Sequence, residues 1–132
     1  NTLSGFCYET NFNSTPMYGP VRFRQKGYEL RMIYLCMNSV EEAQKRVAIR
    51  VQNGGHYVPE AEIKKRYADG FANLNTHFHD FDSIDFFETS AYAQPPEYIF
   101  SVVNNTINKK LPAKYSYLKE LIPDIIKLPV NT

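Results

Sequence analysis

The chain has 132 residues, which suits a single domain or part of one. Hydrophobic residues make up 43% and charged residues 22% of it, the proportions of a soluble globular protein with a buried core. No apolar run approaches the roughly 18 residues that span a bilayer, and no N-terminal stretch has the pattern of a secretory signal. The sequence therefore predicts a cytoplasmic protein without a membrane partner.

The formal net charge of +1 hides a strong local pattern. Residues 20–66 hold ten Lys or Arg against five Asp or Glu, a balance of +5, whereas residues 67–108 hold six acids and no Lys or Arg. A basic stretch within a neutral protein indicates a local anionic ligand. It does not indicate a nucleic-acid partner, because nucleic-acid-binding domains are usually basic overall.

The first expected element is a short strand over residues 5–11, whose aromatic and Thr side chains favour a pleated surface. A helix follows over about residues 15–26, with Gly27 as its left-handed C-terminal cap. Residues 28–37 are predicted to form a second strand. Its second half, MIYLCM, is continuously apolar, as is typical of a strand covered on both faces.

Asn38-Ser39 is predicted to cap the next helix, which ends at Asn53-Gly54-Gly55. Its apolar side chains follow helical spacing and are expected to face the sheet. They are Val40, Ala43, Val47 and Val51. Pro59 opens a further helix, which is expected to pack through a second apolar stripe. That stripe consists of Ile63, Tyr67, Phe71, Leu74 and Phe78.

Residues 83–89 are predicted to form a third strand. Residues 98–103 and 106–110 flank Asn104-Asn105, a pair typical of a tight hairpin turn. A helical tail over residues 114–127 ends the chain. Strands alternating with helices predict an α/β fold with a mainly parallel sheet and a C-terminal β-hairpin. Three strands are few for such a sheet, so we expect that others are missing or are supplied by another chain.

Cys7 and Cys36 lie in apolar runs that resemble strands, where free cysteine acts as a small hydrophobe. His77 and His79 would share one side of an extended segment and could bind a metal. A solvated loop is the simpler interpretation, because no other pair of ligands has a diagnostic spacing. We therefore predict neither a disulfide framework nor a metal site.

Arg46 and Arg50 are four residues apart and therefore share one face of their helix. One interpretation is a solvated charged face, which is what most charge runs form. The other is a pair of guanidinium groups aimed at phosphate oxygens, to which the planar fork of Arg is well matched. With Gly54, Gly55, His56 and Arg66, the two arginines would form a basic lid over residues 46–66, which could close over phosphates.

The run RVAIRVQNGGHYVPEAEIKKRYADGFANL closely resembles the lid region of zeta-toxin-like P-loop kinases. The pattern in that family is an Arg-rich helix, then Gly-Gly-His-x-Val-Pro, an Arg-Tyr pair and Asn-Leu. Upstream, GFCYETNF and GYELRMIYLCMNSVEEA resemble the family's substrate-lining strand and the strand and helix that follow it. Downstream, IDFFETSA resembles a late family strand, with Glu88-Thr89-Ser90 in place of Asp-Asn-Ser.

The resemblance implies part of a three-layer P-loop kinase-like fold. It also implies an enzyme that uses ATP or GTP with Mg²⁺ to phosphorylate a small hydroxyl substrate, in characterised toxins a nucleotide-activated amino sugar such as a UDP-amino sugar. An antitoxin is the partner that the family suggests. By position, Arg46, Arg50 and Arg66 would act on the transferred phosphate, and Glu9 and Asn11 would contact the substrate. Gly54, Gly55 and His56 would belong to the phosphate-binding lid.

No stretch of the sequence matches GxxxxGK(S/T), the loop that holds phosphates in such kinases. The catalytic Asp strand that follows this loop in the family has no counterpart either. We therefore expect residues 1–132 to be one domain, the C-terminal portion of a P-loop kinase-like domain, inactive by itself and without a tightly bound cofactor.

Two alternatives from other classes stay open. One is a non-catalytic module that binds phosphate or nucleotide without turnover. The other is a scaffold without a ligand, in which exposed sheet edges pair two copies into a homodimer.

Overall fold

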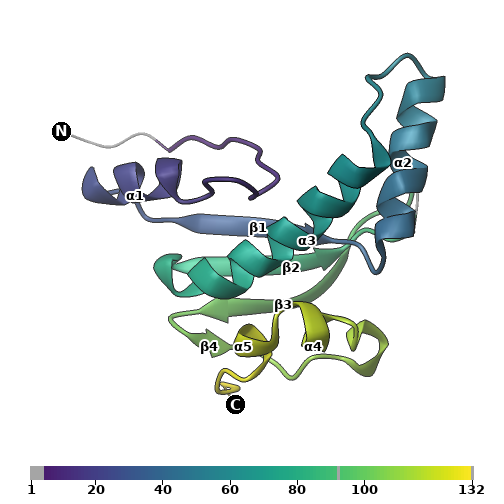
Figure 1. The fold of residues 1–132 in the computed structure, drawn as a ribbon. Coiled ribbons are helices and arrows are strands. Elements are labelled where there is room, and N and C mark those ends of the chain that lie inside the picture. The colour runs from purple at the N-terminus through teal and green to yellow at the C-terminus, as the bar shows by residue number, and fades with distance from the viewer. Residues whose placement is uncertain (1–4, 92, 132) are drawn as a thin grey trace.

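The computed structural model describes residues 5–91 and 93–131 of the chain. One four-stranded sheet, in the order β1-β2-β3-β4, carries α3, α4 and α5 on one face (Figure 1). The strands are β1 (Arg31–Cys36), β2 (Ser83–Glu88), β3 (Glu97–Val103) and β4 (Thr106–Ile107). The α-helices are α1 (Tyr18–Gln25), α2 (Val40–Gln52), α3 (Glu60–His77), α4 (Leu118–Leu121) and α5 (Pro123–Ile126). Two short 3₁₀ turns are η1 (Phe78–Asp80) and η2 (Ala113–Tyr115).

The fold is a mixed α/β fold, and its sheet is mostly antiparallel. Strands β1 and β2 run parallel, with Tyr34 beside Phe86, whereas β2 with β3 and β3 with β4 are antiparallel. The prediction of a mainly parallel sheet is therefore wrong. Only the eight residues 89–96 join β2 to β3, and a parallel crossover needs a dozen residues or more.

The predicted hairpin is confirmed at Asn104 and Asn105. Both residues have positive φ, 51° and 61°, as a type I′ turn requires. Its second strand is shorter than predicted. The Asn108 N–H still donates to Ser101 O at 3.1 Å, but the Ser101 N–H donates at 2.7 Å to the side-chain Oδ1 of Asn108 and not to its backbone carbonyl. The outer edge of β4 is covered by the chain end, since the Ile107 N–H donates to Pro129 O at 2.9 Å.

The expected strand over residues 5–11 is not formed, and its Cys7 is exposed rather than buried. Aromatic contacts hold this segment instead, with the rings of Phe6 and Phe23 4.6 Å apart. Phe12 then turns into the core, and its carbonyl accepts a hydrogen bond from Asn73 Nδ2 at 2.9 Å. The N-terminal segment therefore packs through side chains and does not join the sheet.

The core lies between the sheet and α3. On β2 the side chains alternate, and Ile84, Phe86 and Glu88 are the buried ones. The predicted stripe of α3 is confirmed. Its buried members are Ile63, Phe71 and Leu74, and its half-buried members are Tyr67 and Phe78. Cys36, at the end of β1, is also fully buried, as predicted.

The apolar residues predicted on α2 do not face the sheet. No residue of this helix is buried. Figure 1 shows that α2 and the start of α3 project beyond the strand ends, and α2 packs against α3. Val40, Ala43, Val47 and Val51 do lie on a helix, as their spacing predicts, but the surface that this helix meets is another helix.

The face of the sheet turned away from α3 carries exposed apolar side chains. Ile33 and Leu35 of β1 are 68% and 56% exposed, and Tyr98 and Val103 of β3 are 42% and 44% exposed. The strand register places all four on this one face. Within the described part of the chain, no helix has the length and apolar character that a bilayer crossing demands.

Gly70 allows three segments to meet on α3. A Cβ atom there would lie 2.8 Å from the Tyr34 hydroxyl and 3.0 Å from the Asn11 carbonyl oxygen. We expect Gly70→Ala to lower the free energy of unfolding by about 1–2 kcal/mol, because overpacking outweighs the roughly 1 kcal/mol gained in helix propensity. Urea denaturation measures the change. In a Tyr34→Phe background the loss should shrink, and a more stable Gly70→Ala variant would contradict the packing argument.

Candidate phosphate-binding site

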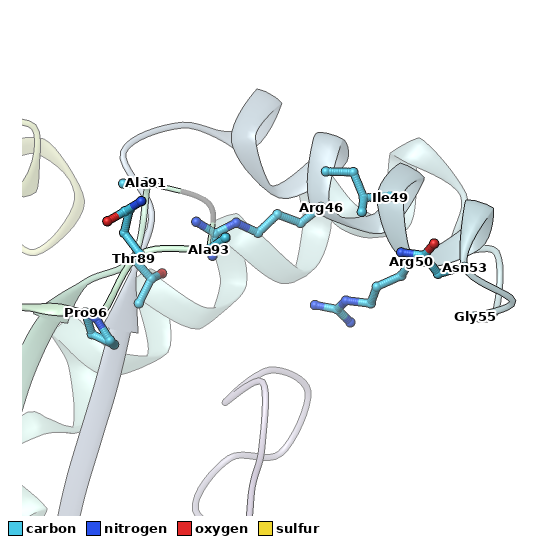
Figure 2. A pocket seen from close by; sticks show the side chains of 10 residues that line it. Arg46, Ile49, Arg50, Asn53, Gly55, Thr89, Ala91, Ala93 and Pro96 are labelled. Carbon is cyan, nitrogen blue, oxygen red and sulfur yellow. The ribbon is translucent and has the colours of Figure 1, made fainter.

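The candidate site lies where the two parallel strands end. Beyond Cys36 the chain enters α2, and beyond Glu88 it enters the β2–β3 loop, residues 89–96. A pocket of about 570 Å³ lies between this loop and α2 (Figure 2). Ligands of open α/β sheets usually bind beyond the carboxyl ends of the strands. The lining residues are Arg46, Ile49, Arg50, Asn53 and Gly55 on one side and Thr89, Ala91, Ala93, Gln94 and Pro96 on the other.

The start of α2 follows the sequence prediction. Ser39 is the N-cap, and its hydroxyl accepts the Glu42 N–H at 3.2 Å. Glu41 and Glu42 lie in the first turn, where negative charge is favoured by the helix dipole. The cap fixes the start of α2 at Val40. Arg46 and Arg50 follow on this helix, and both line the pocket between α2 and the β2–β3 loop.

Arg46 is the best-placed cation in the pocket. Figure 2 shows its side chain reaching from α2 toward Ala93 of the loop. Its Nε and Nη2 atoms are buried and have no hydrogen-bond partner among the residues that the structure describes. A buried donor without a partner is costly, and more so when it is charged. Phosphate and carboxylate oxygens are acceptors of the kind that these donors lack.

Arg50 lines the same pocket one turn further along α2. None of the ten lining residues is Asp or Glu, so no lining side chain offsets the two guanidinium charges. A pocket with two cations and no carboxylate fits an anion. It does not fit Mg²⁺, which proteins bind through carboxylates.

Arg66 does not join this pair. Its Nε donates to Glu62 Oε1 at 3.0 Å on the surface of α3, where both side chains are 42% exposed. Two of the three predicted arginines therefore share the pocket. Arg66 has the i, i+4 ion pair that usually belongs to a solvated helix face.

Gly54 and Gly55 end α2 in a Schellman motif. The Gly54 N–H donates to Val51 O at 3.1 Å, and the Gly55 N–H donates to Arg50 O at 2.7 Å. Gly54 has φ +90°, and a Cβ on Gly55 would lie 2.8 Å from the Arg50 carbonyl oxygen. Both N–H groups are therefore used by the helix and not offered to a ligand, although Gly55 still lines the pocket. His56 is exposed and does not line it.

Glu9 and Asn11, the predicted substrate contacts, lie away from the arginines. Both are exposed and neither lines the pocket. The Asn11 carbonyl faces Gly70 in the middle of α3. The structure thus brings together Arg46, Arg50 and Gly55 of the predicted residues. The others do not line the pocket, and they are Glu9, Asn11, Gly54, His56 and Arg66.

A buried polar network behind the loop was missed from the sequence. The Glu88 carboxylate is 8% exposed and accepts hydrogen bonds from the Ser90 and Tyr117 hydroxyls. Burial, followed by the bond to Glu88, raises the pKa of the Tyr117 phenol, so that it stays a donor. The alternation of Ile84, Phe86 and Glu88 was the available signal, because it places a carboxylate on the buried side of β2.

Two further groups near this network keep their protons for the same reason. Burial raises the pKa of the Tyr67 phenol to about 12, and Tyr67 donates to Met37 O at 2.8 Å. Burial also raises the pKa of the Cys36 thiol, with the Glu88 charge as the smaller cause. A thiol held protonated is a poor nucleophile.

The interpretation of His77 and His79 as metal ligands gains no support from the described residues. His77 Nδ1 and His79 Nε2 each lie near Asp80, at 3.9 and 3.8 Å. Across residues 5–91 and 93–131, no three His, Cys, Asp or Glu side chains are grouped so that they could hold a metal ion.

We compared the chain with protein-family models, with curated proteins and with solved structures, and none of the three comparisons finds a match.

Proposed function

We propose that this chain binds a phosphorylated ligand between α2 and the β2–β3 loop, as the C-terminal part of a zeta-toxin-like nucleotide-dependent kinase. Its role in that kinase would be to hold phosphate in the lid while a small hydroxyl substrate, such as a UDP-amino sugar, is phosphorylated. ATP or GTP with Mg²⁺ would be required, and the loop that holds them would come from outside these 132 residues.

The observation that carries the proposal is the Arg46 guanidinium. Two of its nitrogen atoms are buried without a partner in the described chain, at the wall of a pocket that also receives Arg50. Phosphate oxygens accept bidentate hydrogen bonds from arginine and carry the charge that the pocket lacks. The apolar lining from Ile49, Ala93 and Pro96 leaves room for the organic part of such a ligand.

Calorimetry tests the binding directly. We expect the protein at low ionic strength to bind ATP, GTP or UDP-N-acetylglucosamine, and Arg46→Gln to weaken that binding about 10- to 100-fold. This follows from about 1.5–3 kcal/mol for a hydrogen bond to a charged group. Lys45→Gln is the matched control, because Lys45 lies on the same helix, has the same charge and is exposed. It should change the affinity less than about twofold.

Three results would contradict the proposal. They are a wild-type protein that binds none of the three nucleotides, a loss of affinity in Lys45→Gln as large as that in Arg46→Gln, and an unchanged affinity in Arg46→Gln. Inorganic phosphate serves as a fourth ligand, and equal affinity for it would remove the nucleotide part of the proposal while keeping the anion site.

The second candidate is a phosphate-binding module without catalysis. It is supported by the pocket itself, whose two arginines can hold a phosphate without a GxxxxGK(S/T) loop. This candidate predicts that the protein binds nucleotide in the calorimeter. It also predicts that a polypeptide carrying both this chain and such a loop transfers no phosphate from ATP to UDP-N-acetylglucosamine when Mg²⁺ is present. Transfer by that polypeptide, lost in Arg46→Gln, would favour the kinase.

A further inference from the structure

We infer that Glu88 and Ser90 are positioning residues, which hold the β2–β3 loop at the distance from Arg46 that the phosphate site needs. This inference rests on the proposed function and extends it. Neither residue lines the pocket, whereas Thr89, Ala91, Ala93, Gln94 and Pro96 of the same loop do. Every described lining residue opposite α2 belongs to this loop, so the position of the loop sets the width of the site.

The hydrogen bonds fix the direction of each proton. The Asn38 N–H donates to Ser90 Oγ at 2.9 Å, so this hydroxyl gives its own proton to Glu88 Oε1. The Tyr117 hydroxyl donates a hydrogen bond to the other carboxylate oxygen, Oε2. A carboxylate accepts both bonds, whereas the amide of a glutamine would turn its NH₂ group toward one of two hydroxyl donors.

The network ties the β2–β3 loop to the connection between β1 and α2. Asn38 belongs to the connection from β1 to α2, and Ser90 belongs to the β2–β3 loop. Next to them, the Thr89 N–H and hydroxyl both donate to Cys36 O, at 2.8 and 3.0 Å. The wall of the site is therefore attached to the end of β1 at two neighbouring residues. Glu88 is almost fully buried and accepts the hydrogen bond of the Ser90 hydroxyl.

Glu88 is an unusual choice if its role were only to fill space. No Lys, Arg or His of the described chain forms an ion pair with it, although buried carboxylates are usually paired. Within the described chain, the donors to its carboxyl group are the Ser90 and Tyr117 hydroxyls. Residues outside a site often orient the residues within it through such buried hydrogen bonds. Here the buried Glu88 carboxyl group holds the Ser90 hydroxyl, which in turn accepts the Asn38 N–H.

The experiment compares nucleotide affinity in four variants by calorimetry. We expect Ser90→Ala and Glu88→Gln each to weaken ATP binding about three- to tenfold, the effect of one hydrogen bond. The double variant should weaken it no more than the stronger single variant, because both residues act through one contact. Ser90→Thr keeps the hydroxyl and should bind like the wild type.

Asn75→Ala is the control for loss of stability alone. Asn75 links α3 to Asp124 through two side-chain hydrogen bonds, at 2.9 and 3.2 Å, and it lies outside the pocket lining. It should lower the melting temperature without changing the affinity. Additive effects of Ser90→Ala and Glu88→Gln, or an affinity loss in Asn75→Ala equal to theirs, would overturn the inference.

A second readout needs no ligand. In the free protein, hydrogen exchange at the amides of Asn38, Thr89 and Gln94 should quicken in Ser90→Ala and Glu88→Gln, and not in Asn75→Ala. Unchanged exchange in both Ser90→Ala and Glu88→Gln would overturn the inference even if nucleotide binds. If the wild-type protein binds no nucleotide but exchange quickens as expected, the loop is positioned by Glu88 and the proposed function is what fails.

Discussion

Phe86→Ala is expected to lower the free energy of unfolding by about 3–5 kcal/mol, the range for removing a fully buried aromatic ring. Phe86 has no exposed surface and lies at the centre of the sheet on the side that faces α3. Its ring stacks on that of Phe100, with the centroids 4.6 Å apart and the planes parallel, and lies 6.1 Å from the ring of Tyr34. The substitution therefore removes contacts with both neighbouring strands, β1 and β3.

Urea denaturation monitored by circular dichroism measures this loss. The adjacent residue provides the control, because Phe87 points to the opposite, uncovered face and is only partly buried. Phe87→Ala should lower the free energy of unfolding by about 1 kcal/mol, the typical effect of a single substitution. Equal losses at the two positions would mean that both faces of β2 are covered in solution.

Leu74→Ala is expected to lower the free energy of unfolding by about 2–5 kcal/mol, because a large buried side chain is replaced and a cavity stays behind. Leu74 is fully buried on α3, between this helix and the sheet. The same change should affect the candidate site, since α2 packs on α3 and presents Arg46 and Arg50. A shift of α3 would therefore also move α2 and the two arginines that it carries.

Thermal and urea unfolding of Leu74→Ala should be measured beside those of Thr76→Ala. Thr76 is exposed on the same helix and donates to Ala72 O, so its replacement should change the stability by less than about 0.5 kcal/mol. If Leu74→Ala were as stable as Thr76→Ala, α3 would not be held by its apolar stripe.

Local signals in the sequence predicted most of the elements, although the strand expected over residues 5–11 is not formed. The two Asn residues of the hairpin and Gly27 after α1 have positive φ, which few residue types adopt readily. Ser39 at the start of α2 supplies the hydroxyl that accepts the Glu42 N–H, which few residue types can do. Such requirements are satisfied within a few residues, so they can be recognised without knowing the rest of the fold. The apolar stripe of α3 was equally clear, because five apolar side chains at helical spacing match one face of a helix and do not match the alternation of a strand.

Long-range arrangement was harder to predict. MIYLCM is apolar throughout, and this suggested a strand covered on both faces, yet Ile33 and Leu35 are exposed. The direction of β3 followed from the length of the β2–β3 loop and not from its own residues. Likewise, Arg46, Arg50 and Arg66 all lie in one basic segment, but an ion pair with Glu62 holds Arg66 on the surface of α3. The net charge of a segment does not reveal which of its arginines will be held by a carboxylate and which will reach a pocket.

The two edges of the sheet differ in how far they can grow. On the β4 side, Ile107 exchanges backbone hydrogen bonds with the chain end, at Pro129 and Asn131, so that border is closed. On the β1 side, no backbone hydrogen bond of the described chain reaches the outer border of Arg31–Cys36. Any additional strand must therefore enter beside β1, where it would also lie next to the loop that leads into the arginine helix.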